Sequence, residues 1–262
     1  MAITIKSERE IELMAEAGKI LERVHNELEK ALHPGMSTKD IDTLGEEIIR
    51  SYGCIPSFLN YNGYPASICV SVNQEVVHGI PDKHRIIHEV DIVSLDAGVI
   101  YKGYHSDAAR THAVGEVSEE AKKLIQVTKE CFFEGIKYAK AGNHLFDISG
   151  AIGRYAEERG YGVVRDLCKR NNRNNAHRRK TGPALHEAPE IPNYEVGRKG
   201  VKLRPGMTLA IEPMINIGTY EVDWLDDDWT VVTRDGSLSA HYENTILITE
   251  GEPRILSLTC DN

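Results

Sequence analysis

The chain has 262 residues, of which 41% are hydrophobic and 27% charged, and its formal net charge is −9 at pH 7. Such a chain can bury a substantial core as one large domain or two small ones, and its acidic balance argues against nucleic acid as the main partner of the whole surface. No stretch approaches the roughly 18 apolar residues that a membrane span needs, and residues 3–10 are too polar for a signal peptide. The cysteines are scattered, odd in number and without a CxxC pair, which predicts reduced thiols in a cytoplasm; they are residues 54, 69, 131, 168 and 260.

The first part of the chain is predicted to form two helices followed by strands. The capping box Ser7-x-x-Glu10 opens a helix whose apolar residues keep a helical spacing as far as Leu28, and His-Pro-Gly at 33–35 stops it. A second helix is expected from about Thr38 to Tyr52, followed by a loop rich in aromatic residues. Strands are then expected at 67–72, 76–77, 92–95 and 101–106.

The second part repeats this pattern. Helices are expected at about 118–141 and 146–160, and strands at 162–167, 208–212, 230–233 and 238–249. Two local segments also correspond, because Pro-Gly-x4-Asp-Ile at 34–41 is echoed by Ala-Gly-x4-Asp-Ile at 141–148. We therefore predict a single α+β domain over residues 1–262, built from pseudo-twofold halves at about 7–115 and 118–250 with a site between them.

The segment 91–107 contains two acidic residues in an apolar context. We interpret it as two strands joined by a turn at Ala97-Gly98-Val99, with Asp96 and Asp107 at the ends of the strands. A buried carboxylate is costly unless it is paired or bound to a cation, and two converging carboxylates offer hard oxygen ligands to divalent metals. A solvated hairpin with two ordinary surface aspartates is the alternative.

Two further acids occur in strands that should otherwise be buried. Glu212 ends the apolar run 209–211, and Glu243 precedes the apolar run 246–248. Four carboxylates gathered at one seam would repel one another and take up protons, whereas two divalent ions would relieve the repulsion. Asp107 and Glu243 are expected to bridge both ions, because they face each other across the seam.

Several segments, in this order, resemble the type I methionine aminopeptidases, which have the pita-bread fold. They are CVSVNQEVVHGIP at 69–81, DAG at 96–98, YHSD at 104–107, HEAP at 186–189, PGMTLAIEP at 205–213, and Trp229 followed by HYE at 241–243. The resemblance covers nearly the whole chain and implies an α+β pita-bread fold with two divalent metal ions (Co, Mn, Fe or Zn). The metal ligands that it implies are Asp96, Asp107, Glu212 and Glu243.

The resemblance also implies how the site acts. His78 and His186 contact the substrate around the scissile amide, and the methionine pocket is lined by Tyr61, Tyr64, Cys69 and Trp229. Two metals about 4 Å apart can lower the pKa of a shared water towards 7, and the resulting hydroxide attacks the first peptide bond. Glu212 carries the proton to the leaving amine. Taken without the resemblance, His78 is a satisfied loop histidine, and Tyr61 and Tyr64 are loop anchors.

The implied function is removal of the initiator methionine from nascent polypeptides in the cytoplasm. The expected partner is therefore the N-terminal Met of a new chain, with a monomeric enzyme, no membrane and no specific DNA. The proline-specific peptidases of the same fold are a near alternative, which the onset of the first helix at Ser7 disfavours because those enzymes usually carry a large extra N-terminal domain.

One segment departs from the family. Between the positions of Cys168 and His186 the family carries Gly-His-Gly-Ile-Gly, whose histidine is a fifth metal ligand; here the 13 residues 169–181 stand where four are expected. This basic insert contains Lys169, Arg170, Arg173, Arg178, Arg179 and Lys180, and its one histidine is His177. His177 is out of register by two from the His186 side, and whether it replaces the missing ligand on the longer loop stays open. Three explanations of this insert remain open: it is a solvated loop, it results from a frameshift or an engineered graft, or it contacts the ribosome or a nucleic acid. Loss of the histidine predicts impaired activity, and the alternative function is a weakened pita-bread protein that binds through this loop.

Overall fold

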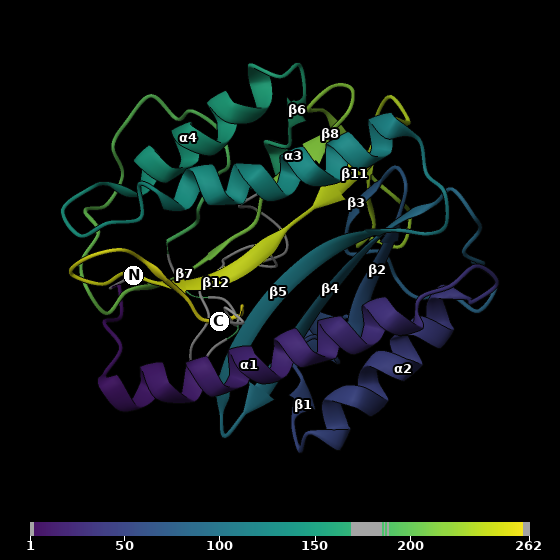
Figure 1. The fold of residues 1–262 in the computed structure, drawn as a ribbon, viewed down its shortest axis with the longest axis horizontal. Coiled ribbons are helices and arrows are strands. Elements are labelled where there is room, and N and C mark those ends of the chain that lie inside the picture. The colour runs from purple at the N-terminus through teal and green to yellow at the C-terminus, as the bar shows by residue number, and fades with distance from the viewer. Residues whose placement is uncertain (1–2, 169–184, 186, 188, 259–262) are drawn as a thin grey trace.

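The computed structural model describes residues 3–168, 185, 187 and 189–258. Its α-helices form two pairs, and Figure 1 shows one pair on each side of the long strands at the centre. The helices are α1 (Glu8–Ala31) with α2 (Thr38–Ser51), and α3 (Glu119–Ile136) with α4 (Leu145–Glu157). Within the described ranges, no helix is long and apolar enough to cross a membrane.

The described strands form a seven-stranded antiparallel sheet and two three-stranded sheets. The large sheet has the order β1-β4-β5-β12-β13, with β2 also paired to β4 and β7 to β12. Its strands are β1 (Ile55–Pro56), β2 (Ile68–Val72), β4 (Ile92–Tyr101), β5 (Tyr104–Ala113), β7 (Thr208–Ile211), β12 (Glu243–Leu247) and β13 (Arg254–Ile255). The small sheets contain β3 (Glu75–Val77), β10 (Val231–Thr233) and β9 (Val222–Trp224), and β11 (Ser239–His241), β8 (Met214–Asn216) and β6 (Gly162–Val163).

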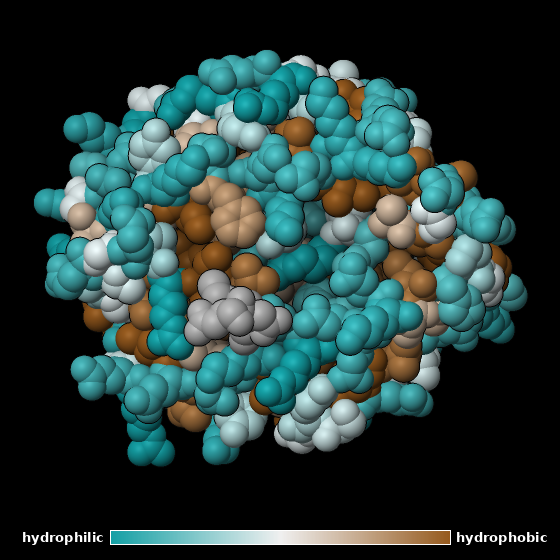
Figure 2. Space-filling model, viewed as in Figure 1, coloured by the Kyte–Doolittle hydropathy of each residue, from teal (hydrophilic) through white to brown (hydrophobic). Residues whose placement is uncertain are grey.

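The apolar faces of the helices form two main clusters with the strands. Met14, Ala17, Leu21, Val24 and Leu28 recur every three or four residues along α1 and are buried, so one stripe of this helix packs on β4 and β5. A second cluster joins α3 and α4 to strands of the second half. In Figure 2, hydrophilic side chains cover the outward faces of the helices, and hydrophobic side chains are visible between the two helix pairs. The α+β class is confirmed, while the division into pseudo-repeat halves remains a prediction.

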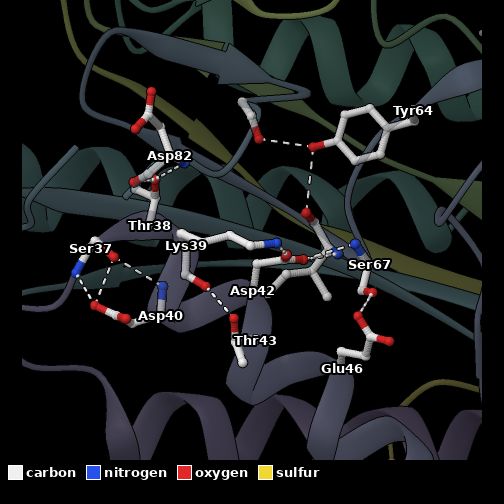
Figure 3. A network of polar contacts seen from close by, with 12 residues as sticks. Ser37, Thr38, Lys39, Asp40, Asp42, Thr43, Glu46, Tyr64, Ser67 and Asp82 are labelled. Carbon is white, nitrogen blue, oxygen red and sulfur yellow. Dashed lines mark hydrogen bonds and ion pairs between the residues drawn. The ribbon is translucent and has the colours of Figure 1, made fainter. Parts of the chain in front are cut away.

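A buried carboxylate joins α2 to β2 (Figure 3). Asp42 is 1% exposed; its Oδ1 accepts hydrogen bonds from the backbone N–H of Ser67 at 2.8 Å and of Ile68 at 3.1 Å. Lys39 donates to Oδ2 of the same carboxylate at 2.6 Å. The contacts satisfy buried groups of both elements and fix the position at which β2 begins.

The predicted turn at Ala97-Gly98-Val99 is wrong. These residues lie inside β4, and the chain reverses at Lys102 (φ 49°) and Gly103 (φ 85°), which form a two-residue hairpin loop. Positive φ at both positions is the geometry that matches the twist of a two-residue hairpin. Gly98 has another role, because a Cβ there would lie 2.8 Å from that of Ser57, the residue after β1. The two aspartates accordingly lie within long strands and not at strand ends.

Two other predicted boundaries are corrected. The strand expected over 238–249 is interrupted at Tyr242, whose N–H bonds to the Pro213 carbonyl at 3.2 Å, so the chain passes from one sheet to another between β11 and β12. The helix expected to reach 141 ends at Ile136, and the following N–H groups of Tyr138 and Ala139 bond to carbonyls three residues back. The sequence pattern could not predict strands β1, β8, β9 and β13. Each has only two or three residues, too few to show the alternation of apolar and polar side chains that marks a strand.

Candidate metal centre

The strand registers place all four predicted acids on one face of the large sheet. Residues directly opposite each other in neighbouring strands point to the same face. Asp96 of β4 lies opposite Ala109 of β5, and Ala109 lies opposite Glu243 of β12. Glu212 directly follows β7, and if the β7–β12 register is extended by one residue it lies opposite Glu243. Asp107 is two residues from Ala109 in β5, so its side chain emerges on the same face. Ala109, which lies between Asp96 and Glu243 in this row, is 0% exposed and carries only a methyl group.

The four acids, together with His241, form two groups of ligand atoms that share one residue. In one, single oxygens of Asp96, Asp107 and Glu243 lie within 4.8 Å of one another. In the other, Glu212 and Glu243 lie within the same distance of a ring nitrogen of His241. Glu243 is common to both groups, whereas Asp107 belongs to one of them. That Asp107 and Glu243 each bridge two ions stays a prediction.

These residues fit divalent metal ions in type and in environment. The exposed fractions of Asp96, Asp107 and Glu243 are 3%, 1% and 0%, and the Glu212 side chain is 13% exposed. Carboxylates so close together in a buried site repel one another unless cations or protons neutralise them. Carboxylate oxygens suit hard ions, and the one imidazole that the described residues add to these groups broadens the choice to borderline transition metals.

Sequence reasoning missed His241 as a ligand candidate. It is 1% exposed, and its Nε2 lies 3.5 Å from Oε2 of Glu212. A signal was present, because within the strand expected over 238–249 His241 precedes Glu243 by two residues, and side chains two apart in a strand share a face.

His78 lies just beyond β3 in a backbone conformation that is unusual for its residue type. Its φ is 60°, and its side chain is 8% exposed. Left-handed backbone outside glycine is costly and is often retained at functional positions. The ring meets that of Trp229 edge to face, with 6.3 Å between centroids.

The predicted pocket residues do come together. Tyr64 and Cys69 are buried in one apolar cluster with Phe58, Ala66 and Leu185, and Tyr61, Ile80 and Trp229 pack against it. The Tyr64 and Trp229 rings are 5.1 Å apart in a T-shaped contact. Cys69 lies opposite Asp96, so the cluster adjoins the acids.

The Tyr64 hydroxyl orients one wall of this cluster. It donates to the Gly79 carbonyl at 2.9 Å and lies 3.4 Å from that of Ile68 (Figure 3). Burial raises the pKa of Tyr64 well above its usual value of 10, so the hydroxyl keeps its proton and remains a donor. The ring is thereby held against the strand that carries Cys69.

Some predicted residues lie outside the described ranges. They are His186 and the whole basic insert 169–181, including His177, and their predicted roles stay predictions. Of their neighbours, Leu185 joins the apolar cluster, and the Glu187 carboxylate binds the ammonium of Lys6 at 3.0 and 3.1 Å.

An antiparallel sheet carrying a buried cluster of acids beside an apolar cluster is the arrangement of a metal-dependent hydrolase. Residues 12–250 match metallopeptidase family M24. The chain therefore belongs to this family, and the fold predicted from the resemblance is confirmed.

Within the family, the similar proteins are methionine aminopeptidases. The chain is 55% identical over 256 residues to one from Clostridium acetobutylicum, covering 98% of this chain and 99% of that protein. It is 47% identical over 248 residues to methionine aminopeptidase 1 of Bacillus subtilis, covering 95% and 96% of the two chains. The crystal structure of a methionine aminopeptidase from Thermotoga maritima superposes with a TM-score of 0.91 at 44% identity, covering 98% of this chain and 100% of that one.

A proline-specific peptidase is less similar. The Xaa-Pro dipeptidase of Bacillus anthracis matches with a TM-score of 0.74 at 25% identity, and the match covers 98% of this chain but 63% of that one. The recognised resemblance to methionine aminopeptidases is thus confirmed. These comparisons lend no support to the predicted impairment or to the alternative of a binding module.

Proposed function

We propose that this protein removes the N-terminal methionine from newly made polypeptides, as a metal-dependent aminopeptidase. The observation that carries the proposal is the row of Asp96, Glu243 and Glu212 across neighbouring strands, with Asp107 on the same face, in a chain 55% identical to a methionine aminopeptidase. The scattered thiols suit a reducing compartment, since the described Cys54, Cys69 and Cys131 are buried and form no disulfide. We accordingly place the enzyme in the cytoplasm, where new chains are made.

Asp96, Asp107, Glu212 and Glu243 hold the metal ions in this proposal. When bound, divalent ions polarise the scissile carbonyl and lower the pKa of water, which makes hydrolysis possible at neutral pH. The burial of three of the four carboxylates supports the assignment, because a low-dielectric site strengthens their attraction for cations.

Glu212 moves the proton. Its side chain is 13% exposed, whereas Asp96, Asp107 and Glu243 are at most 3% exposed, so Glu212 has the best access to the substrate side. Asn193 donates to its backbone carbonyl at 2.8 Å and fixes the chain at this point. A carboxylate held in this way can accept a proton from water and pass it to the leaving amine.

His78 and His186 bind the scissile amide. The constrained backbone of His78 and its contact with Trp229 support this role, since both restrict where the imidazole points. A positioned histidine can donate a hydrogen bond to the carbonyl oxygen as negative charge develops there. The role of His186 is carried over from the family motif alone.

The cluster of Tyr61, Tyr64, Cys69 and Trp229 forms the methionine pocket. Its aromatic and thiol surfaces suit an unbranched thioether, which can pass between rings and make favourable sulfur–aromatic contacts. A methylene of lost contact costs about 1–3 kcal/mol in such a pocket. Peptides that begin with Met should therefore be cleaved at least about tenfold faster than those that begin with Leu or Ala.

Peptide hydrolysis tests the proposal. The purified chain, loaded with Co²⁺ or Mn²⁺, is assayed on Met-Ala-Ser, Leu-Ala-Ser and Ala-Ala-Ser, and again after removal of the metal with a chelator. We expect metal-dependent release of methionine and slow cleavage of the other two peptides. Equal cleavage of all three peptides, or a loaded chain that releases no methionine, would contradict the assignment.

A further inference from the structure

We propose that His241 is a ligand of one of the two divalent ions in this chain and supplies a nitrogen donor on the Glu212 side of the site. The inference rests on the proposed metallopeptidase function and adds a residue to it. Among the described residues, His241 is the one histidine that belongs to either ligand group.

The sheet holds the His241 backbone in place beside the acids. Its N–H donates to Oγ1 of Thr111 at 2.9 Å, and the same hydroxyl donates to the His241 carbonyl at 2.9 Å. On its other side, His241 pairs with Met214 of β8. Because the main chain is bonded on both sides, the imidazole has little freedom except rotation about its own side-chain bonds.

The distance between the donors suits a shared ion. Nε2 of His241 lies 3.5 Å from Oε2 of Glu212. Two donors that each lie about 2.1 Å from one ion, at an angle of about 90–110°, are separated by about 3.0–3.4 Å. A shift of a few tenths of an ångström thus brings both atoms to coordination distance, and an oxygen of Glu243 is within reach of the same point.

The two metal positions differ in their ligands. The group of Asp96, Asp107 and Glu243 offers oxygen alone, whereas the group of Glu212, His241 and Glu243 offers oxygen and nitrogen. Imidazole favours Co²⁺, Fe²⁺ or Zn²⁺ over Mg²⁺ and Mn²⁺. The position next to His241 should therefore be the one that selects the transition metal.

A structural role for His241 makes a different prediction. If the ring served only to hydrogen-bond and orient Glu212, a glutamine amide of similar reach would replace it. If the ring coordinates the ion, glutamine removes the nitrogen donor and the binding of that ion suffers. His241→Gln therefore separates the two roles.

The experiment measures the metal rather than turnover. The full chain, His241→Gln and His84→Gln are stripped of metal and titrated with Co²⁺, with calorimetry for affinity and stoichiometry and visible absorption for the ligand field. X-ray absorption of each Zn²⁺-loaded protein then counts imidazole ligands. We expect His241→Gln to bind one ion at least about tenfold more weakly, with one imidazole fewer. His84→Gln is the matched histidine control, because His84 is exposed and belongs to neither ligand group, and it should bind as the starting protein does.

A third variant covers the possibility that His241→Gln fails to fold. In His241→Cys a thiolate occupies the same position, and Co²⁺ bound there should show a thiolate charge-transfer band that the starting protein lacks. Retention of affinity and imidazole count in His241→Gln, or the absence of that band in a folded His241→Cys, would overturn the inference. Failure of the starting chain to bind any Co²⁺ would instead overturn the proposed function, so the two failures are distinguishable.

Discussion

Glu243 is the residue on which both ligand groups depend. Its side chain belongs to the oxygen-only group and to the group that contains His241, and it is 0% exposed. Its neighbours in the sheet hold it there, because Arg110 donates to the Glu243 carbonyl and, at 2.6 Å, to Oδ1 of Asn244. A single carboxylate is thus shared by both ligand groups.

Glu243→Gln should weaken the binding of both ions, whereas Asp96→Asn should weaken one, because Asp96 belongs to one ligand group. The amide of glutamine keeps the shape of the side chain but removes the charge that both groups share. Calorimetric titration with Co²⁺, supported by metal analysis after dialysis, measures both affinities. Binding of two ions by Glu243→Gln as tightly as by the starting protein would show that this carboxylate is not shared.

His25 makes the stability of the fold depend on pH. It is fully buried, and its Nε2 is 2.9 Å from the Ala108 carbonyl. Burial first, and then the charges of Arg110 and His112, lower the pKa of His25 well below 6.5, so the ring is neutral in the folded protein. The unfolded chain binds a proton below about pH 6.5 that the folded chain does not, so this contribution is complete above that pH and is lost as the pH falls below it.

Urea unfolding of the metal-free protein between pH 7.5 and 5 should show this effect. The free energy of unfolding should fall with a slope that includes up to about 1.4 kcal/mol per pH unit from this one group. In His25→Gln the side chain keeps a donor but does not titrate, so the slope should be shallower by that amount. An identical slope in the two proteins would rule out His25 as the source.

At the scale of elements, Gly79 sets how closely the loop after β3 approaches β2. A Cβ at this position would lie 2.3 Å from the Val70 carbonyl oxygen, which is backbone and cannot rotate away. The Gly79 carbonyl also accepts hydrogen bonds from the Val70 N–H at 3.1 Å and from the Tyr64 hydroxyl. The packing of two elements therefore places the adjacent His78.

Gly79→Ala should push this loop away from β2. We expect it to destabilise the fold by about 1–3 kcal/mol and to reduce peptide hydrolysis, because His78 moves with the loop. Gly251→Ala is the control, since the nearest atom to a Cβ there is 4.0 Å away. Equal unfolding free energies for the two variants in urea would show that the close approach is not needed.

At the scale of the whole molecule, Lys6 links segments far apart in the sequence. Its ammonium is 0% exposed and contacts both carboxylate oxygens of Glu187, and its N–H donates to the Gly206 carbonyl at 2.8 Å. Gly206 in turn bonds to the carbonyl of Ile248. The N-terminal arm is thereby attached to Glu187 and Gly206, about 180 and 200 residues further along the chain.

Lys6→Met should remove the ion pair while keeping most of the apolar stem. Because Glu187 is 18% exposed, water can reach the carboxylate that is left, and we expect a loss of about 1–3 kcal/mol in the free energy of unfolding. Lys19→Met is the matched control, since its pair with Glu16 is about half exposed and should contribute about 0–1 kcal/mol. Urea denaturation of both variants compares the two pairs, and similar losses would contradict a special role for Lys6.

Much of the fold could be predicted from local patterns. The capping box at Ser7 and the apolar spacing of α1 and α2 determine these helices, because both signals act within a few residues. The hairpin turn could not be placed in the same way. Gly98 and Gly103 look alike in sequence, and the difference lies in Ser57, which only the folded chain brings against Gly98.

The sequence by itself indicated which acids could form the site: Asp96 lies in an apolar run, Glu212 and Glu243 adjoin apolar runs, and Asp107 follows Asp96 on the next strand. Only the tertiary structure decided how they are shared between two groups and that His241 joins them. The physical reason is that strand register, set by pairing between strands that are not neighbours in the sequence, places Glu243 opposite both Ala109 and Glu212. Spacing along one strand defines which face a side chain occupies, but the partner strand defines what it meets there.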